Sequence, residues 1–253
     1  MRIEQSGVYK RAFDMHTHAI PAVDDGATSS EESVGMLKRA LECGVGTVAL
    51  TSHCSIHRDD GIERFLNMRK PSLDRLLFRM KERGFAMPLL VGAEIYADHD
   101  ISSHALLDSL CYTAVPGTGA EEPTNKCLLY ELPPISDRDV AVRSISKLNS
   151  RGYKVLMAHV ERYRDCDEIM SALSGLDIYY QINADSLLSF GGKSMFDKML
   201  RRSGRIVLSS DMHNLGKRPC RIDRALALVE KKFGSDIAEA VFVGNARAFL
   251  GIK

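Results

Sequence analysis

The chain has 253 residues, of which 45% are hydrophobic, and a formal net charge of +1 at pH 7. This length and composition allow one full-sized α/β domain. The near-neutral charge excludes a global field that would favour nucleic acid or an anionic membrane surface. No apolar run approaches the roughly 18 residues that span a bilayer, and the first residues lack the apolar segment of a secretion signal. We therefore expect a soluble, cytoplasmic protein with no nucleic-acid partner and no membrane insertion.

The six cysteines lie far apart and form no CxxC pair. This usage is typical of reduced thiols rather than of disulfides or a structural zinc site. No cysteine is followed by an arginine six positions later, the spacing that a cysteine-dependent phosphatase needs. A thiolate mechanism for phosphate ester hydrolysis is therefore excluded.

Along the chain, short apolar runs alternate with amphipathic stretches, a pattern typical of strands and helices in turn. After a first short run before His16, the strand-like runs are 45–50, 87–93, 127–130, 153–158, 177–182 and 205–210. Helical periodicity covers 28–44, 61–83, 136–151, 163–174, 193–203 and 219–233. Thr28 and Glu31 have capping-box spacing at the start of the first helix. The stretch 115–126 is expected to be one long loop.

A strand followed by a helix about seven times predicts an α/β fold with a parallel sheet, closed or nearly closed into a TIM-like barrel. No linker is long enough to separate two domains. We expect a single domain over residues 1–253.

In a (β/α) barrel, the residues just past the strand ends converge on one mouth. Here every predicted strand is followed by a side chain that can bind a metal ion or form a hydrogen bond to a metal ligand. Asn183 is of the second kind. A carboxylate beside a buried strand end must also be paired or metal-bound to offset its desolvation. The sequence therefore predicts a multi-metal site whose candidate ligands are His16, His18, Asp25, His53, Glu94, Glu131, His159, Asp211 and His213.

Imidazoles and carboxylates without thiolates suit two to three divalent ions, manganese foremost, with iron or zinc as alternatives. Such clustered ions hydrolyse phosphate esters, with a metal-bound hydroxide as the nucleophile. Arginine provides the planar, bidentate donors that phosphate requires. Arg162 follows His159 by three residues and Arg218 follows His213 by five, so both are candidate catalytic residues.

The motifs DMHTH, VDDG, TSH, GAEIY, YEL, AHVERY and SDMHN, in this order over nearly the whole chain, resemble the polymerase-and-histidinol-phosphatase (PHP) superfamily. Within it, the chain is most similar to bacterial manganese-dependent protein tyrosine phosphatases of capsular and exopolysaccharide operons. All the metal-ligand positions match. The departures are the loop CSIHRDDGIER after His53, Ala246 near the C-terminus, and an N-terminal extension at residues 1–11.

The resemblance implies a distorted (β/α)7 barrel and three metal ions. It assigns His16, His18, Glu94 and Asp211 to one ion, His53 and His159 with Glu94 to a second, and Asp25, Glu131 and His213 to a third. It also implies that Arg162 and Arg218 bind phosphate. The implied substrate is a phosphotyrosine cluster on a bacterial tyrosine kinase that controls polysaccharide synthesis and export. A small-molecule phosphatase of the histidinol-phosphatase type and a metal-dependent nuclease are the alternatives.

Overall fold

The computed structural model describes residues 11–58, 60–97, 99–132 and 138–253, with the backbone alone at Arg138, and its strands form two sheets. The first contains β1 (Ala12–Asp14), β2 (Val45–Leu50), β4 (Leu89–Val91) and β6 (Thr113–Ala114), in that order across the sheet. The second contains β10 (Ile206–Ser209), β9 (Ile178–Asn183), β8 (Tyr153–Met157), β7 (Lys126–Glu131), β5 (Glu94–Ala97) and β3 (His53–Ile56). These strands pair in parallel, except that β4 and β6 are antiparallel.

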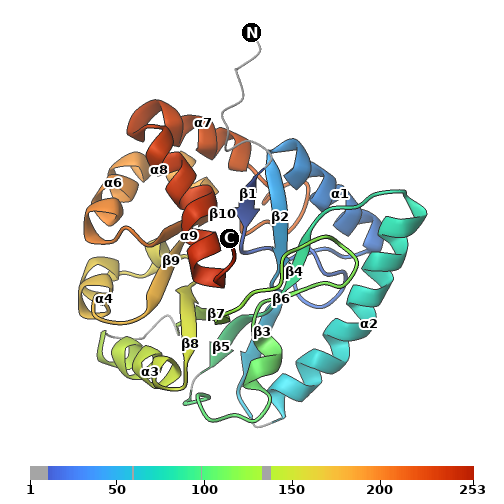
Figure 1. Ribbon diagram of the computed structural model, residues 1–253, viewed down its shortest axis with the longest axis horizontal. Helices are drawn as coiled ribbons and strands as arrows, with labels where there is room; N and C mark the ends of the chain where they lie inside the picture. The colour runs from blue at the N-terminus through green and yellow to red at the C-terminus, as the bar shows by residue number, and fades with distance from the viewer. Residues whose placement is uncertain (1–10, 59, 98, 133–137) are drawn as a thin grey trace.

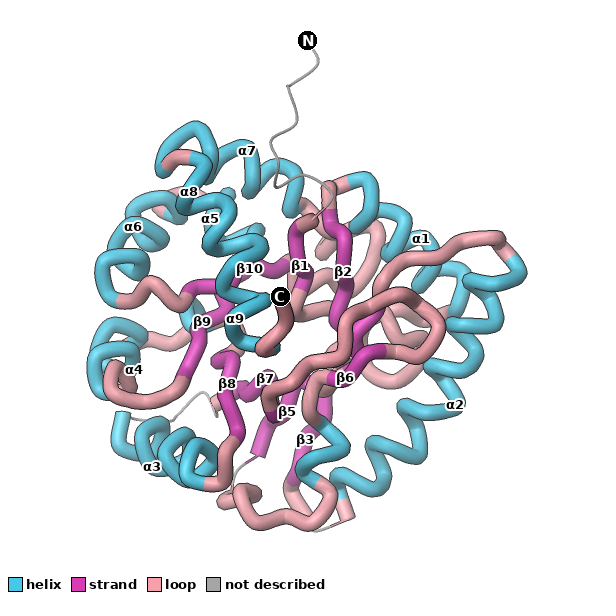
Figure 2. Tube along the Cα trace, viewed as in Figure 1, coloured by secondary structure: helices cyan, strands magenta, loops and turns pink. Residues whose placement is uncertain are grey.

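Main-chain hydrogen bonds join the two sheets at the carboxyl ends of their strands. The segment after β1 lies between the segments after β2 and β10, because Thr51 N donates to Thr17 O and His18 N donates to Met212 O, each at 2.9 Å. β3 and β5 continue β2 and β4 after two-residue breaks. Figures 1 and 2 show the strands grouped at the centre with the helices around them. The predicted α/β class and strand–helix alternation are confirmed.

The apolar runs form strands because both of their faces are buried. Every residue of β9 and of β10 is buried, as expected for parallel strands covered by helices on one side and by the core on the other. One contiguous cluster of buried apolar side chains links the strands and helices. Of the stretch predicted as a long loop, residues 115–125 lie between β6 and β7 and Lys126 begins β7, so that prediction is confirmed apart from its last residue.

Six of the helices correspond to the predicted ones, whereas the C-terminal helical segment and one short helix were not predicted. The six are α1 (Ser30–Glu42), α2 (Gly61–Glu82), α3 (Arg138–Ser150), α4 (Cys166–Ala172), α6 (Gly192–Arg202) and α7 (Ile222–Phe233). The others in the described ranges are α5 (Ala184–Leu188), α8 (Ser235–Glu239), a π-helical turn at Ala240–Gly244, α9 (Asn245–Leu250) and two 3₁₀ turns at Leu107–Leu110 and Val160–Arg162. None of the helices in the described ranges combines the length and apolar content needed to cross a membrane.

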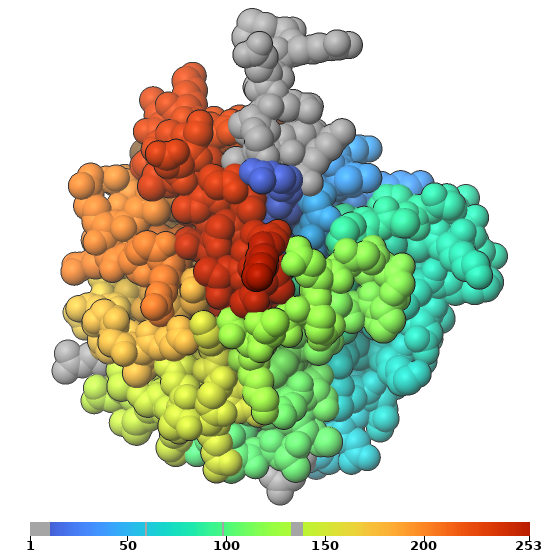
Figure 3. All heavy atoms as spheres, in the orientation of Figure 1, coloured from blue at the N-terminus to red at the C-terminus, as the bar shows by residue number. Residues whose placement is uncertain are grey.

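The C-terminal helix α9 covers the amino ends of the strands. The Cys127 thiol at the start of β7 donates to Phe249 O at 2.9 Å, and Thr124 N donates to Leu250 O at 3.0 Å. Figure 3 shows this segment, in red, packed against the loop before β7, in green. The C-terminal segment therefore packs against the amino end of β7, opposite the carboxyl ends that the predicted site residues follow.

The N-terminus of α1 differs by one residue from the predicted capping box. Ser29, rather than Thr28, is the N-cap, and its hydroxyl accepts a hydrogen bond from Glu32 N at 3.2 Å. The Glu32 carboxylate, rather than that of Glu31, reaches back and accepts from Thr28 N and Thr28 Oγ1 at 2.9 and 2.8 Å. The spacing was correct but its register was wrong, because adjacent Thr, Ser and Glu residues offer two equivalent registers.

We predict that Ser29→Ala lowers the free energy of unfolding by about 1 kcal/mol, since Glu32 N then loses its side-chain acceptor. Ser30→Ala, one residue further along, is the control and should change it by less than about 0.5 kcal/mol. Urea denaturation monitored by circular dichroism measures both values. Equal effects of the two substitutions would contradict the assignment of the cap.

Candidate metal centre

The residues predicted to bind metal lie at the carboxyl ends of the strands and form one cluster. Each has a ring nitrogen or carboxylate oxygen within 3.5 Å of such an atom of another member. They come from the segments that follow β1, β2, β4, β8 and β10 and from the last residue of β7. The members are His16, His18, Asp25, His53, Glu94, Glu131, His159, Asp211 and His213.

The buried carboxylate of Glu94 lies at the middle of this cluster, with 1% of its side chain exposed. Nitrogen atoms of four imidazoles lie within 3.3 Å of its oxygens: His16 Nε2 at 3.2 Å, His18 Nε2 at 3.3 Å, His53 Nδ1 at 2.8 Å and His159 Nε2 at 2.9 Å. Glu94 can therefore bridge neighbouring cations.

Three groups of donors surround this carboxylate. His16, His18 and Glu94 offer ligand atoms within 4.8 Å of one another, and Asp211 Oδ1 lies 3.5 and 3.4 Å from the two imidazole Nε2 atoms. The second group is His53, Glu94 and Glu131, and the third is His18, Asp25, His53 and His213.

The grouping differs from the implied assignment at Glu131. That assignment joined Glu131 to Asp25 and His213, whereas Glu131 groups here with His53 and Glu94, and its Oε1 lies 3.5 Å from His159 Nε2. β5 and β7 are neighbouring parallel strands, so the carboxylates of Glu94 and Glu131 reach the same side of the cluster.

Asp24 is a functional residue that the sequence reasoning missed. Its Oδ2 accepts hydrogen bonds from His18 Nδ1 at 2.7 Å and from the main-chain nitrogen of His53 at 2.9 Å. The neighbouring Gly26 lies against His18, because a Cβ at this position would be 2.0 Å from His18 O. The only sequence signal was the pair of aspartates in VDDG, of which one was taken as a ligand. Asp24 instead orients the candidate ligand His18, in the way that carboxylates orient metal-binding imidazoles.

The charges in the cluster depend strongly on one another. Burial opposes ionisation of Glu94, but the neighbouring charge of His16 and hydrogen bonds from imidazoles outweigh it and hold the pKa of Glu94 well below its usual range. Burial likewise opposes protonation of His16 and His18, yet Glu94 and Asp211 raise the pKa of both imidazoles. Burial and the charge of His18 lower the pKa of His213 to about 4. Glu94 therefore remains ionised, and its negative charge favours cations nearby.

Several buried acceptor atoms have no hydrogen-bond donor, and this observation fits a metal centre. Glu94 Oε2, Asp211 Oδ1 and His213 Nε2 are buried without a hydrogen bond of acceptable geometry. Leaving such an acceptor unsatisfied costs about 1–3 kcal/mol, and more for a charged group. His213 Nδ1 donates to Asp211 O at 3.0 Å, which leaves its Nε2 lone pair free. Imidazole nitrogen and carboxylate oxygen suit manganese, iron or zinc.

Two members of the cluster have a left-handed backbone. His159 has φ of 30° and Asp211 has φ of 52°, a conformation that L-residues with a Cβ rarely adopt. Each such residue costs about 1–3 kcal/mol and persists only where its surroundings hold it. Each is the second residue after a strand, so the backbone turns sharply where these side chains join the cluster.

The two predicted arginines meet at the edge of the cluster. Arg162 Nη2 and Arg218 Nη2 donate to the same oxygen, Asp211 Oδ2, at 2.9 and 2.7 Å. Their side chains are 48% and 38% exposed. The donors are therefore held beside the buried carboxylates while one side of each guanidinium faces solvent.

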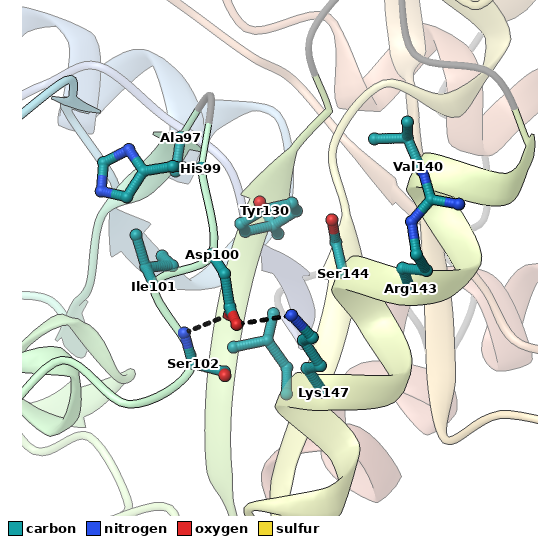
Figure 4. Close-up of a pocket in the computed structure, with 11 residues that line it drawn as sticks. Ala97, His99, Asp100, Ile101, Ser102, Tyr130, Val140, Arg143, Ser144 and Lys147 are labelled. Carbon is teal, nitrogen blue, oxygen red and sulfur yellow. Dashed lines mark hydrogen bonds and ion pairs between the residues drawn. The ribbon is translucent and has the colours of Figure 1, made fainter.

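A separate pocket of about 220 Å³ lies between α3 and the loop after β5. Figure 4 shows Lys147 of α3 facing Asp100 across it, where the two form an ion pair at 2.7 Å. Arg143, Ser144 and Tyr130 also line this pocket, but none of the nine clustered residues does. It is distinct from the metal centre.

Comparison with known proteins shows which family the chain resembles. A family model described as "Capsular polysaccharide synthesis, CpsB/CapC" matches residues 12–251. Tyrosine-protein phosphatase CpsB of Streptococcus pneumoniae is 28% identical over 94% of this chain and 98% of its own length. Tyrosine-protein phosphatase YwqE of Bacillus subtilis is 30% identical over 89% of this chain and 86% of its own length.

Solved structures agree with this comparison. A crystal structure from work on YwqE of B. subtilis and CpsB of S. pneumoniae, described as unique metal-dependent tyrosine phosphatases, aligns with a TM-score of 0.70 and 25% identity, covering 89% of each chain. An amidohydrolase from Mycoplasma synoviae aligns with a TM-score of 0.56 at 14% identity over 96% of this chain and 88% of its own, which shows a shared fold alone. The family model covers nearly the whole chain, and the chain belongs to the CpsB/CapC family of capsular polysaccharide synthesis.

Proposed function

We propose that this protein is a metal-dependent protein-tyrosine phosphatase that hydrolyses phosphotyrosine in a partner protein. The observation that carries the proposal is the convergence of nine metal-binding side chains and two half-exposed arginines on one strand edge. The named phosphatase activity of CpsB and YwqE supports it. Phosphotyrosine is a phosphate monoester, and its hydrolysis needs an activated water and positive charge around the phosphoryl oxygens.

Two to three divalent ions, manganese foremost, would be held by the donor groups described above. When bound, the ions supply an activated water and neutralise charge on the phosphoryl group. Glu94 would be shared between the first two groups, since its Oε2 lies close to His16 and His18 of the first group and to His53 of the second. The side chains of Asp25 and His53 are 65% and 37% exposed, so the third group is the one that substrate meets first.

Arg162 and Arg218 would bind the phosphoryl oxygens. The guanidinium fork matches phosphate bidentately, and Asp211 Oδ2 holds both groups in place before substrate arrives. Asn183 Nδ2 donates to the same oxygen at 2.8 Å. Asp211 would thus order both sides of the site, with Oδ1 toward the metal donors and Oδ2 toward the arginines.

The cysteines support a mechanism without a thiolate. Burial raises the pKa of Cys54, the neighbour of His53, to about 12, and that of Cys111 to about 12. Both remain protonated thiols at neutral pH and are poor nucleophiles. We propose a cytoplasmic location, supported by six cysteines that are all free.

The proposed partner is a bacterial tyrosine kinase in polysaccharide synthesis and export. The family description supports the link to polysaccharide synthesis. We also propose that the whole chain is one PHP-type domain whose strands form a distorted seven-stranded barrel. In this count β2 with β3, and β4 with β5, are each one interrupted strand, and β6 is left out. The residues before Arg11, predicted as an extension, lie outside the described part of the chain.

We predict that the purified protein hydrolyses an aryl phosphate and phosphotyrosine peptides when Mn²⁺ is added and loses this activity with a chelator. Phosphotyrosine peptides should be hydrolysed faster than histidinol phosphate, and DNA should not be cut. Phosphate release in parallel assays measures all of these. Preferential hydrolysis of histidinol phosphate would favour the small-molecule phosphatase, and cleavage of DNA would favour the nuclease.

We predict that Arg162→Ala and Arg218→Ala each lower kcat/KM for an aryl phosphate by about 100-fold or more, as loss of an aimed transition-state donor does. Inhibition by inorganic phosphate should weaken in both variants, and metal content by elemental analysis should be unchanged. Arg164→Ala and Lys217→Ala, exposed neighbours of the two arginines, are matched controls and should retain activity. Loss of metal in the arginine variants would instead assign them a structural role.

We predict that stabilisation by Mn²⁺ increases with pH between about 6 and 8. The pKa values of His16 and His18 are raised in the folded protein, so protonation of these imidazoles stabilises the metal-free protein. This stabilisation is complete at pH values below the ordinary histidine pKa of about 6.5. This stabilisation is lost as pH rises through the raised values, and protons then cease to compete with metal. Thermal melts with chelator and with Mn²⁺ at several pH values measure the difference in Tm. A difference that is independent of pH would contradict ligation by these imidazoles.

A further inference from the structure

Gln181 and Asn183 are two polar residues in β9, which is otherwise formed by apolar and aromatic residues. The exposed fraction is 0% for Gln181 and 4% for Asn183. Side chains alternate across a strand, so both point to the same face of β9. A buried amide must have its donors and acceptors satisfied, and the partners of these two amides are members of the metal centre.

The orientation of the Gln181 amide is fixed by its neighbours. Gln181 Oε1 accepts a hydrogen bond from the main-chain nitrogen of His159 at 2.6 Å, and a main-chain N–H can only donate. The opposite end, Gln181 Nε2, donates to Asn183 Oδ1 at 2.6 Å. Asn183 Nδ2 in turn donates to Asp211 Oδ2 at 2.8 Å. Exchanging oxygen and nitrogen in either amide would put two donors or two acceptors against each other.

This orientation determines which nitrogen of His16 carries the proton. Gln181 Oε1 also lies 3.0 Å from His16 Nδ1, and a carbonyl oxygen has no proton to give. His16 Nδ1 is therefore the donor, and in the neutral imidazole the lone pair lies on Nε2. His16 Nε2 lies 3.2 Å from Glu94 Oε2 and 3.1 Å from His18 Nε2, so it faces the other candidate ligands. His16 is thus preset as a metal ligand through Nε2.

The same oxygen acts on a second ligand. His159 has the left-handed backbone conformation noted above, and its N–H is held by Gln181 Oε1. This holds the turn from which His159 Nε2 reaches Glu94 Oε1 at 2.9 Å. One side-chain oxygen therefore orients an imidazole on each side of the Glu94 carboxylate.

We propose that Gln181 is a positioning residue for the metal centre, acting through His16 and His159 and, by way of Asn183, through Asp211. The proposal rests on the proposed function and deepens it by naming the residue that sets the affinity for metal. A merely structural amide would affect folding stability without a selective effect on metal binding. Partners behind the ligands typically change metal affinity by about 10- to 100-fold.

The test compares Gln181→Met, similar in length but unable to accept or donate, with Gln181→Glu, which keeps an acceptor for His16 Nδ1 and His159 N. Calorimetric titration of metal-free protein with Mn²⁺ gives the Kd, and the visible absorption of bound Co²⁺ reports the ligand geometry. We expect Gln181→Met to weaken Mn²⁺ binding by about 10- to 100-fold and to alter the Co²⁺ spectrum. Gln181→Glu should restore part of the affinity, because it keeps the acceptor for His16 and His159 but loses the donor to Asn183 Oδ1. Activity of Gln181→Met should recover at saturating Mn²⁺.

Tyr179→Phe, on the same face of β9, is the control for perturbing the strand and should bind Mn²⁺ like the parent protein. Should Gln181→Met fail to fold, Gln181→Asn replaces it: the amide is kept but withdrawn by one methylene, and the affinity should fall similarly. Unchanged affinity in the folded variants, with normal metal binding by the parent protein, would overturn the role of Gln181 alone. A parent protein that binds no Mn²⁺ would overturn the proposed function itself.

Discussion

The attraction between one buried carboxylate and the imidazoles around it organises this end of the molecule. Glu94 is 1% exposed and lies within 3.3 Å of nitrogen atoms from four histidines that three different segments of the chain contribute. An isolated carboxylate in such a position would be strongly destabilising. The imidazoles can neutralise Glu94 only by carrying protons or by sharing a metal cation with it. This end of the molecule therefore requires positive charge.

The strands place these groups without any long-range signal in the sequence. Parallel strands end at the same edge, and the ends of β1, β2, β4, β7, β8, β9 and β10 carry a histidine, carboxylate or amide. At His159 and Asp211 the left-handed backbone turns the chain sharply, which a regular strand end does not do. Local strain at two residues is offset by the network that includes Gln181, Asn183 and the two arginines. The proposed metal donors and the two arginines are thus joined through Asp211.

Much of this arrangement could be predicted, because it depends on local patterns. Apolar runs identified the buried strands, and the rule that functional groups follow strand ends identified the residues that cluster around Glu94. Asp24 and Gln181 could not be found in this way, because their roles depend on hydrogen bonds across 6 to 165 positions of the chain. The grouping of Glu131 with His53 also depends on which strands are neighbours. The register of the α1 cap was missed because Thr28 and Ser29 are equally suitable caps, and the helices after α7 lie in a stretch where no strand follows.

The central claim is that cations gather around Glu94. The most direct test is the anomalous diffraction signal of manganese in crystals of the protein grown with Mn²⁺. The account predicts two or three strong peaks, at least one within bonding distance of a Glu94 oxygen and all bounded by the nine clustered side chains. A well-ordered map with no peak beside Glu94, or with manganese bound only elsewhere on the molecule, would contradict it.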